Sequence, residues 1–143
     1  MIKKLSLLLI VLIISKNSWA AEQEILIKTS QDWSGQELTY PKRQTELTTL
    51  RITIAPQEII PFHCHQVALF GYVLSGSVQV ETMSGKKETL KKGETLVEVQ
   101  NTWHRGFNPS KSKNTEIVLF YVGSKGVDNA IIYNEVNKGK CHE

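Results

Sequence analysis

Residues 59–82 read IIPFHCHQVALFGYVLSGSVQVET, and this stretch indicates the fold. It contains three short segments that are rich in β-branched and aromatic residues, at 59–65, 69–74 and 77–82. Ser75-Gly76 supplies a tight two-residue turn between the last two segments. Outward from this stretch, further strands are predicted at 24–28, 48–54, 95–99 and 116–122. Many short strands, with no long amphipathic helix between them, predict an all-β sandwich or barrel.

The first 20 residues have the pattern of a secretory signal peptide. Lys3 and Lys4 precede an apolar run at 5–14, and Ser-Trp-Ala at 18–20 places small residues at the −3 and −1 positions of a cleavage site. The apolar run is far shorter than the roughly 20 residues that span a bilayer. We therefore expect a cleaved signal, a periplasmic or secreted protein, and no stable membrane insertion.

The charge of the chain is also explained by this segment. The 143 residues include 17 basic and 14 acidic ones, a formal net charge of +3, and three of the lysines (Lys3, Lys4 and Lys16) lie in the signal. The mature chain is therefore neutral and offers no electrostatic basis for binding nucleic acid or an anionic membrane. Its length suits one domain. We divide the chain into a signal peptide (1–20), an N-terminal strand and connection (21–45), a barrel (46–123) and a polar tail (124–143).

Three histidines form the most informative pattern in the chain. His63 and His65 lie two residues apart in an extended segment, so their side chains point to the same face and Cys64 points to the other. His104 follows the predicted strand at 95–99 after a short turn. Strands of a barrel can bring such residues together across its interior, where imidazoles converge on a metal. We predict a divalent metal site formed by His63, His65 and His104.

These residues resemble the two sequence motifs of the cupin superfamily. The matching positions are His63, His65 and Gly76 in the first motif, and Gly93, His104 and Asn108 in the second. The resemblance covers roughly residues 47–122 and is strongest to small, single-domain, exported cupins. It implies a double-stranded β-helix (jelly-roll) barrel, a metal site at the three histidines, a small-molecule ligand or substrate, and a homodimer.

The chain departs from the cupin motifs at four positions. The opening glycine is Gln57, and the proline and glycine of the second motif are Val99 and Asn101; Asn tolerates the left-handed conformation of a glycine. The metal-binding glutamate falls at Leu69 or Phe70, neither of which can bind a metal. Three neutral ligands leave an ion its full charge, which strengthens it as a Lewis acid. Iron, manganese, zinc, nickel and copper all remain possible.

Glu98 and Arg105 are candidate catalytic residues. Glu98 is a possible replacement ligand or acid–base group, but alternation along 95–99 places it opposite the apolar Val97 and Val99, which we expect to face the interior. A bulge near the turn would reverse this orientation. Arg105 either faces the pocket mouth and holds an anionic substrate or forms a surface ion pair.

Cys64 and Cys141 allow one intramolecular pairing. Export to an oxidising compartment permits a disulfide between them, and the alternative is a buried free thiol at Cys64. His142 beside Cys141 is interpreted as a solvated residue of the tail.

Three functions remain open, because one fold hosts many chemistries. The first is a small-molecule metalloenzyme of oxygenase, isomerase or hydrolase type. The second is a non-catalytic module that binds a small ligand or the metal itself, and the third is an interaction scaffold with a vestigial site. An enzyme needs a second polar group near the metal for proton transfer. A pocket lined only by groups such as Leu69 and Phe70 favours binding or scaffolding.

Overall fold

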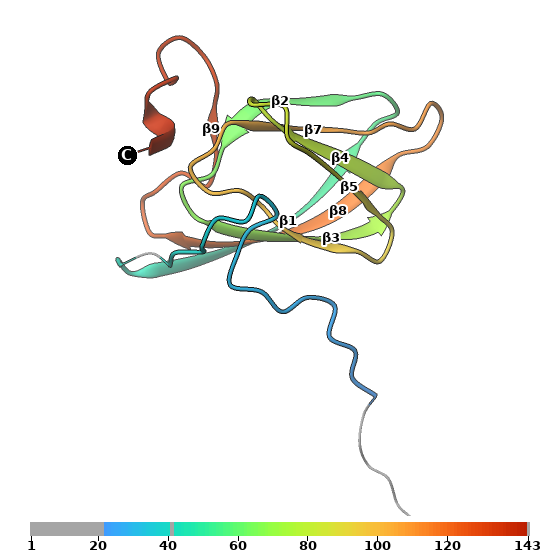
Figure 1. The fold of residues 1–143 in the computed structure, drawn as a ribbon, viewed down its shortest axis with the longest axis horizontal. Helices are drawn as coiled ribbons and strands as arrows, with labels where there is room; N and C mark the ends of the chain where they lie inside the picture. The colour runs from blue at the N-terminus through green and yellow to red at the C-terminus, as the bar shows by residue number, and fades with distance from the viewer. Residues whose placement is uncertain (1–21, 41, 143) are drawn as a thin grey trace, which may run out of the picture.

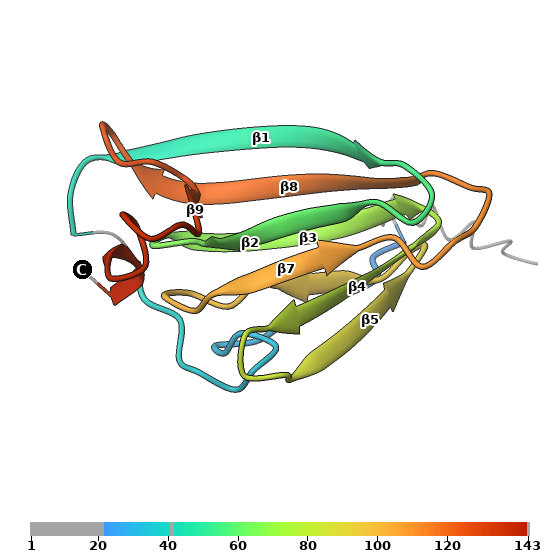
Figure 2. The same cartoon turned by 90° about the horizontal axis from the view of Figure 1, so that it is seen from above.

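The fold of the chain is an all-β barrel made of two facing antiparallel sheets (Figures 1 and 2). The computed structural model describes residues 22–40 and 42–142, so the predicted signal peptide lies outside the described residues. The elements are β1 (Thr45–Ile54), β2 (Ile59–Cys64), β3 (Ala68–Ser75), β4 (Ser77–Thr82), β5 (Lys87–Lys91), β6 (Thr95–Val97), β7 (His104–Phe107), β8 (Thr115–Ser124), β9 (Ile131–Ile132) and the short 3-10 helix η1 (Lys140–His142). No helix among these residues is long and apolar enough to cross a membrane.

One sheet has the strand order β1-β8-β3-β6, and the other has the order β5-β4-β7-β2-β9. Each strand pair within the sheets is antiparallel. Figure 1 shows the interior between the two layers, with β1, β3 and β8 on one side and β2, β4 and β7 on the other. The prediction of an all-β jelly-roll barrel is therefore confirmed.

The core is concentrated at one end of this interior. In β4, Val78, Val80 and Thr82 are buried and alternate with more exposed neighbours, which is the period of a strand that covers a core on one face. The main apolar cluster combines such residues from both sheets: Ile54, Val73, Val78, Val80, Leu90 and Ile117. The histidine site lies elsewhere along the same interior.

At two positions where the cupin motif has a glycine, this chain has another residue but keeps the left-handed backbone conformation that favours glycine. Gln57 has φ of 61° and Asn101 has φ of 50°, and they are the non-glycine residues with positive φ in the described chain. The Asn101 N–H donates to the carbonyl of His65 at 2.8 Å, so this turn helps to fix a histidine of the site. The expected left-handed conformation at Asn101 is present.

The tail is part of the folded domain. β9 pairs with the end of β2, and a disulfide joins Cys64 to Cys141 across a Cα–Cα distance of 5.9 Å. Both cysteines are fully buried in a cluster with Trp103, against which Ile131 and Tyr133 pack. The tail therefore lies against the strand that carries His63.

The segment before β1 differs from its prediction. Residues 24–28 form no strand, and their apolar side chains are largely exposed, with Ile25 at 77 %. Residues further along this segment contact the barrel instead: the Trp33 N–H donates to the carbonyl of Val97 at 3.0 Å, and the Thr39 N–H donates to the side chain of Gln100 at 3.1 Å. This segment thus lies along the edge of β6, and Trp33 packs against the main apolar cluster.

Candidate metal centre

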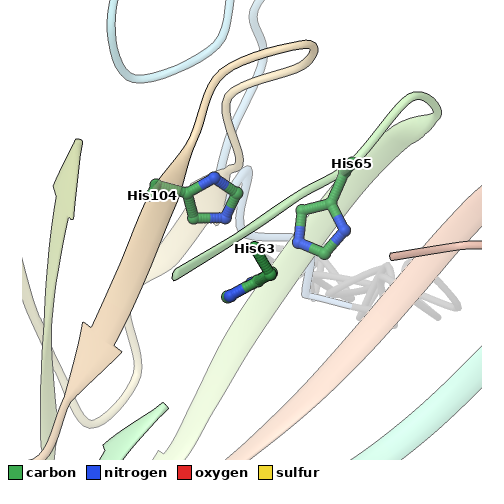
Figure 3. Close-up of side chains that lie close together, drawn as sticks. All are labelled: His63, His65 and His104. Atoms are coloured by element: carbon green, nitrogen blue, oxygen red, sulfur yellow. The ribbon is translucent and has the colours of Figure 1, made fainter. Parts of the chain in front are cut away.

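The three predicted histidines come together inside the barrel (Figure 3). His63 in β2 is paired directly with His104 in β7, and His65 follows just after the end of β2. One ring nitrogen from each histidine lies within 4.8 Å of those of the other two. The ring centroids of His63 and His104 are 4.4 Å apart. Two adjacent antiparallel strands thus place three imidazoles around one point.

Backbone carbonyls orient all three rings in the same way. The Nδ1 atoms of His63, His65 and His104 each lie 2.8 Å from a carbonyl oxygen, of Pro61, Asn129 and Thr102 respectively. An imidazole that donates its Nδ1–H to a carbonyl presents the lone pair of Nε2, and this is the outer-shell arrangement found around histidines that bind metals. The donor set therefore fits a divalent metal.

Burial keeps these imidazoles neutral. Burial, followed by the neighbouring His104 and His63, lowers the pKa of His65 to about 3. Burial also lowers the pKa values of His63 and His104 below the usual range. Neutral imidazoles are the form that binds metals, so the protein does not need to release a proton from these rings at neutral pH to accept an ion.

His104 carries a polar atom that the protein leaves without a partner. Its side chain is 1 % exposed, and Nε2 is the buried side-chain atom of the described residues that has no hydrogen-bond partner. Buried polar atoms are nearly always satisfied, so an orphan atom points to a missing partner such as an ion. The nearest charged group is Glu98, whose Oε2 lies 3.7 Å from this nitrogen.

Glu98 faces the interior, which differs from the expectation. Alternation correctly separates Glu98 from Val97 and Val99, but Glu98 lines the cavity and the two valines do not, although both are buried. Both faces of this strand are buried, so an apolar face does not identify the interior. Burial raises the pKa of Glu98, more than the indole of Trp33 lowers it.

Leu69 stands where the cupin motif has its metal-binding glutamate, and its side chain faces the cavity. Leu69 is 1 % exposed and lines the cavity beside the histidines. Tyr121 is paired with it on β8, and its ring centroid lies 5.5 Å from that of His65. Burial raises the pKa of Tyr121 to about 12, so its hydroxyl keeps its proton. Nothing in the local sequence marks Tyr121 as a site residue, because an aromatic residue in an apolar strand is most simply interpreted as part of the core or of a subunit interface.

Two further contacts to the site come from the chain ends. Trp33 donates its indole N–H to Oε2 of Glu98 at 3.2 Å, and the carbonyl of Asn129 accepts from His65. Neither residue belongs to a motif, and neither is close in sequence to the group that it contacts. No local sequence pattern identifies them.

Arg105 does not line the cavity. Its guanidinium forms a two-pronged ion pair with Glu81, with Nε and Nη2 at 3.0 and 2.7 Å from Oε2, and it lies over the ring of Phe62. Since His104 points inward, alternation along β7 turns Arg105 outward. The geometry therefore favours the surface ion pair over contact with a substrate. Cys64 likewise points away from the histidines, into its disulfide.

The histidines open onto a cavity of about 340 Å³. Apart from the three rings, the polar groups in its wall include Glu98 and Tyr121, and most of the remaining wall is aliphatic. The aliphatic residues that lie deepest in the core are Ile54, Val73, Val78, Val80, Leu90 and Ile117. A volume of this size accommodates a small molecule.

The cupin domain family matches residues 50–121, which is half of the chain. The chain belongs to the cupin family. This cupin is 33 % identical over 86 residues to germin-like protein subfamily 3 member 1 of Arabidopsis thaliana, and 31 % identical over 86 residues to germin-like protein 1 of Brassica napus. The matches cover 57 % of the cupin but only 41 % and 42 % of those relatives, so it spans well under half of their length.

Solved structures resemble this cupin in fold. The DMSP lyase DddQ of Ruegeria pomeroyi has a TM-score of 0.51 at 13 % identity, over 60 % of the cupin and 42 % of the lyase. Oxalate decarboxylase of Bacillus subtilis has a TM-score of 0.51 at 16 % identity, over 62 % and 24 %. A double-stranded β-helix protein of Klebsiella pneumoniae has a TM-score of 0.53 at 13 % identity, over 68 % and 91 %. These likenesses show the shared barrel and nothing about the substrate.

Proposed function

We propose that this cupin binds one divalent transition-metal ion through Nε2 of His63, His65 and His104, and acts with it as an enzyme on a small molecule. The observation that carries the proposal is the common orientation of the rings, in which three Nδ1 atoms contact carbonyls and three Nε2 atoms are left for an ion. Imidazole ligands suit zinc, copper, iron and nickel, whereas manganese usually takes more oxygen ligands. When bound, such an ion supplies Lewis-acid or redox chemistry.

The polar groups beside the histidines support catalysis over a vestigial site. Tyr121 keeps its proton and can donate a hydrogen bond to an oxygen of the substrate. Glu98 brings a carboxylate to the same cavity. A site of this kind holds the reactive end of a molecule between the ion and a fixed donor. A DMSP lyase and an oxalate decarboxylase share the barrel fold, which is consistent with an enzyme.

The cavity wall indicates the class of ligand. Beyond the polar end, aliphatic side chains from both sheets line the space, so an apolar body is favoured and a sugar, whose hydroxyls would lose their hydrogen bonds, is disfavoured. We propose a small molecule with one polar, metal-binding end and an apolar remainder. The same apolar wall also supports the second candidate, a non-catalytic binding module for such a ligand.

Two further features of the setting belong to the proposal. The predicted signal peptide and the disulfide support a periplasmic or secreted protein, because disulfides persist in oxidising compartments. The stacked rings of Phe70 and Phe120, with centroids 4.9 Å apart, lie opposite the cavity on the outer face of their sheet, and Phe70 is 41 % exposed. An exposed aromatic pair of this kind supports the proposed homodimer.

The metal content of the mature protein tests the proposal. The protein is purified from the exported fraction without a histidine tag, beside a His63→Ala/His104→Ala variant and a matched His142→Ala control. We expect about one ion per chain in the wild type and in the control, and a loss of at least 90 % in the double variant, by elemental analysis. Wild-type protein that is free of metal and takes up no added divalent ion would refute it.

A further inference from the structure

The cavity holds a carboxylate that the three-histidine site does not use. We propose that Glu98 is a fourth protein ligand of the ion, and that Trp33 positions it. This inference rests on the proposed metal site and adds to it an acidic ligand from a different strand. The ion then has three imidazoles and one carboxylate, with at least one position left for a small molecule.

One distance, from Glu98 to His104, fits a shared ion. The ligand atoms that all lie within 4.8 Å of one another are those of the three histidines and do not include Glu98, so the Glu98 side chain would turn toward the ion on binding. In a five-coordinate site with bond lengths of about 2.1 Å, neighbouring ligand atoms lie about 3.0 to 3.6 Å from each other. Oε2 of Glu98 lies 3.7 Å from Nε2 of His104, which is within a few tenths of an ångström of that separation and too long for a hydrogen bond. This nitrogen is the orphan atom of the site. An ion between the two atoms would satisfy both.

The charge balance also calls for a cation at this place. The side chain of Glu98 is 13 % exposed, and the ion pairs of the described residues give it no lysine or arginine partner, only His104. A carboxylate largely removed from water is costly unless a cation or several donors compensate it. Its side chain accepts from the indole N–H of Trp33 and, with a smaller effect, from the backbone N–H of Val99, and neither donor carries a charge. A divalent ion at the histidines supplies the missing positive charge.

Glu98 can supply a carboxylate to the site from a neighbouring strand, although Leu69 stands at the position of the motif glutamate. The Glu98 N–H donates to the carbonyl of Leu69 at 2.8 Å, and Phe70 is paired with Val97 in the neighbouring register. Residues directly opposite in an antiparallel pair point to the same face. Leu69 and Glu98 therefore both face the cavity, and the carboxylate sits one strand away from the position of the motif glutamate.

Trp33 is held rigidly enough to position this carboxylate. Its N–H donates to the carbonyl of Val97, and its turn is closed by Asp32, whose Oδ1 accepts the N–H groups of Ser34 and Gln36 at 2.8 and 3.0 Å. Asp32 is 6 % exposed, so this turn is part of the packed structure. Trp33 lies outside residues 50–121, the part of the chain that matches the family. The segment before the barrel thus reaches the metal site through one indole.

Cobalt(II) binding to the full mature chain tests the inference. Affinity is measured by chelator competition and coordination by the visible absorption of the bound ion, for wild type, Glu98→Gln, Trp33→Phe and a matched Glu88→Gln control on the exposed side of β5. Loss of an outer-shell contact typically weakens metal binding about 10- to 100-fold. We expect Glu98→Gln to bind at least about 100-fold more weakly with an altered spectrum, and Trp33→Phe about 10-fold more weakly with a smaller spectral change.

A rescue variant separates a ligand from a merely structural residue. Leu69→Glu in the Glu98→Gln background returns a carboxylate to the opposite strand, and it should restore most of the affinity and the four-ligand spectrum. Glu98→Gln protein that is folded by circular dichroism and binds cobalt within twofold of wild type, with an unchanged spectrum, would overturn the inference and leave the three-histidine site intact. Wild type that binds no cobalt would instead remove the metal site on which both proposals rest. If Glu98→Gln does not fold, an unchanged spectrum in Trp33→Phe overturns the positioning role.

Discussion

Removal of the Cys64–Cys141 disulfide should destabilise the protein by several kilocalories per mole. The two residues are 77 positions apart, so the disulfide closes a long loop in the unfolded chain. The chain-entropy relation for a loop of this length gives about 4.5 kcal/mol at 25 °C. Both cysteines are fully buried, so Cys64→Ala/Cys141→Ala is preferred to serine, which would bury two hydroxyl groups. Truncation of the two sulfurs adds a smaller packing loss in the same direction.

The measurement is urea unfolding of the metal-free protein in the presence of a chelator, so that bound metal does not contribute. With an m-value of about 1.5 kcal/mol per molar, the expected loss moves the midpoint down by about 3 M. Reduced wild type, unfolded in dithiothreitol, should fall close to the variant. Cys141→Ala alone should lose nearly as much as the double variant, because opening the loop accounts for most of the effect.

The same variant has a second expected effect at the metal site. The tail supplies the carbonyl of Asn129 that orients His65, and the disulfide fixes this tail to β2. Loss of an outer-shell contact weakens metal affinity by about 10-fold or more. A loss of stability below about 1 kcal/mol in both the variant and the reduced wild type would refute the loop-closure reasoning. Unchanged metal affinity in a destabilised variant would show that β9 holds the tail without the disulfide.

Three further predictions concern the core, the site and the cavity. Asn108→Ala should lower the free energy of unfolding by about 3 kcal/mol in urea titrations. Asn108 is fully buried, and its Nδ2 lies within 3.0 Å of the carbonyls of Ile54, Ala55 and Lys113, which would lose their donor. A change below about 1 kcal/mol would contradict this. Metal-free protein should lose stability as the pH falls below about 6.5, because the unfolded chain then binds a proton on His65 that the folded chain, with a pKa of about 3, does not. The loss should reach roughly 2 kcal/mol at pH 5, and equal urea midpoints at pH 7 and pH 5 would speak against it. In metal-loaded protein, alkyl hydroxamates should bind about 4-fold more tightly for each added methylene until the cavity is filled, as measured by calorimetry. Val73→Trp, which fills part of the cavity, should abolish this gain. An affinity that does not depend on chain length would exclude an apolar ligand.

The sequence predicted the strands and the histidines well because both follow local rules. Strands such as 77–82 are short and end at turn residues, and the spacing of His63 and His65 fixes their common face. The third histidine, His104, was placed by the same strand logic together with the family motif. The barrel and the clustering of these three residues follow from these patterns.

The rest of the site depends on contacts between distant parts of the chain. The sequence predicts that Glu98 faces away because Val97 and Val99 are apolar, but these valines are buried on the other face of the strand, and Glu98 lines the cavity beside Trp33. Residues 24–28 have the composition of a strand but have no partner strand to pair with in the described structure. Alternation gives the two faces of a strand, and tertiary packing decides which of them is the interior.

The two ends of the chain give this cupin a means of diversifying without altering its barrel. Trp33 and Asn129 both lie outside the family-matched residues 50–121, yet one contacts Glu98 and the other orients His65. Substitutions in the ends are not limited by strand pairing in the way that substitutions in the sheets are. Selection could therefore adjust metal preference or reactivity by changing the terminal segments alone, and grafting these ends onto a related barrel would be a direct way to transfer the property.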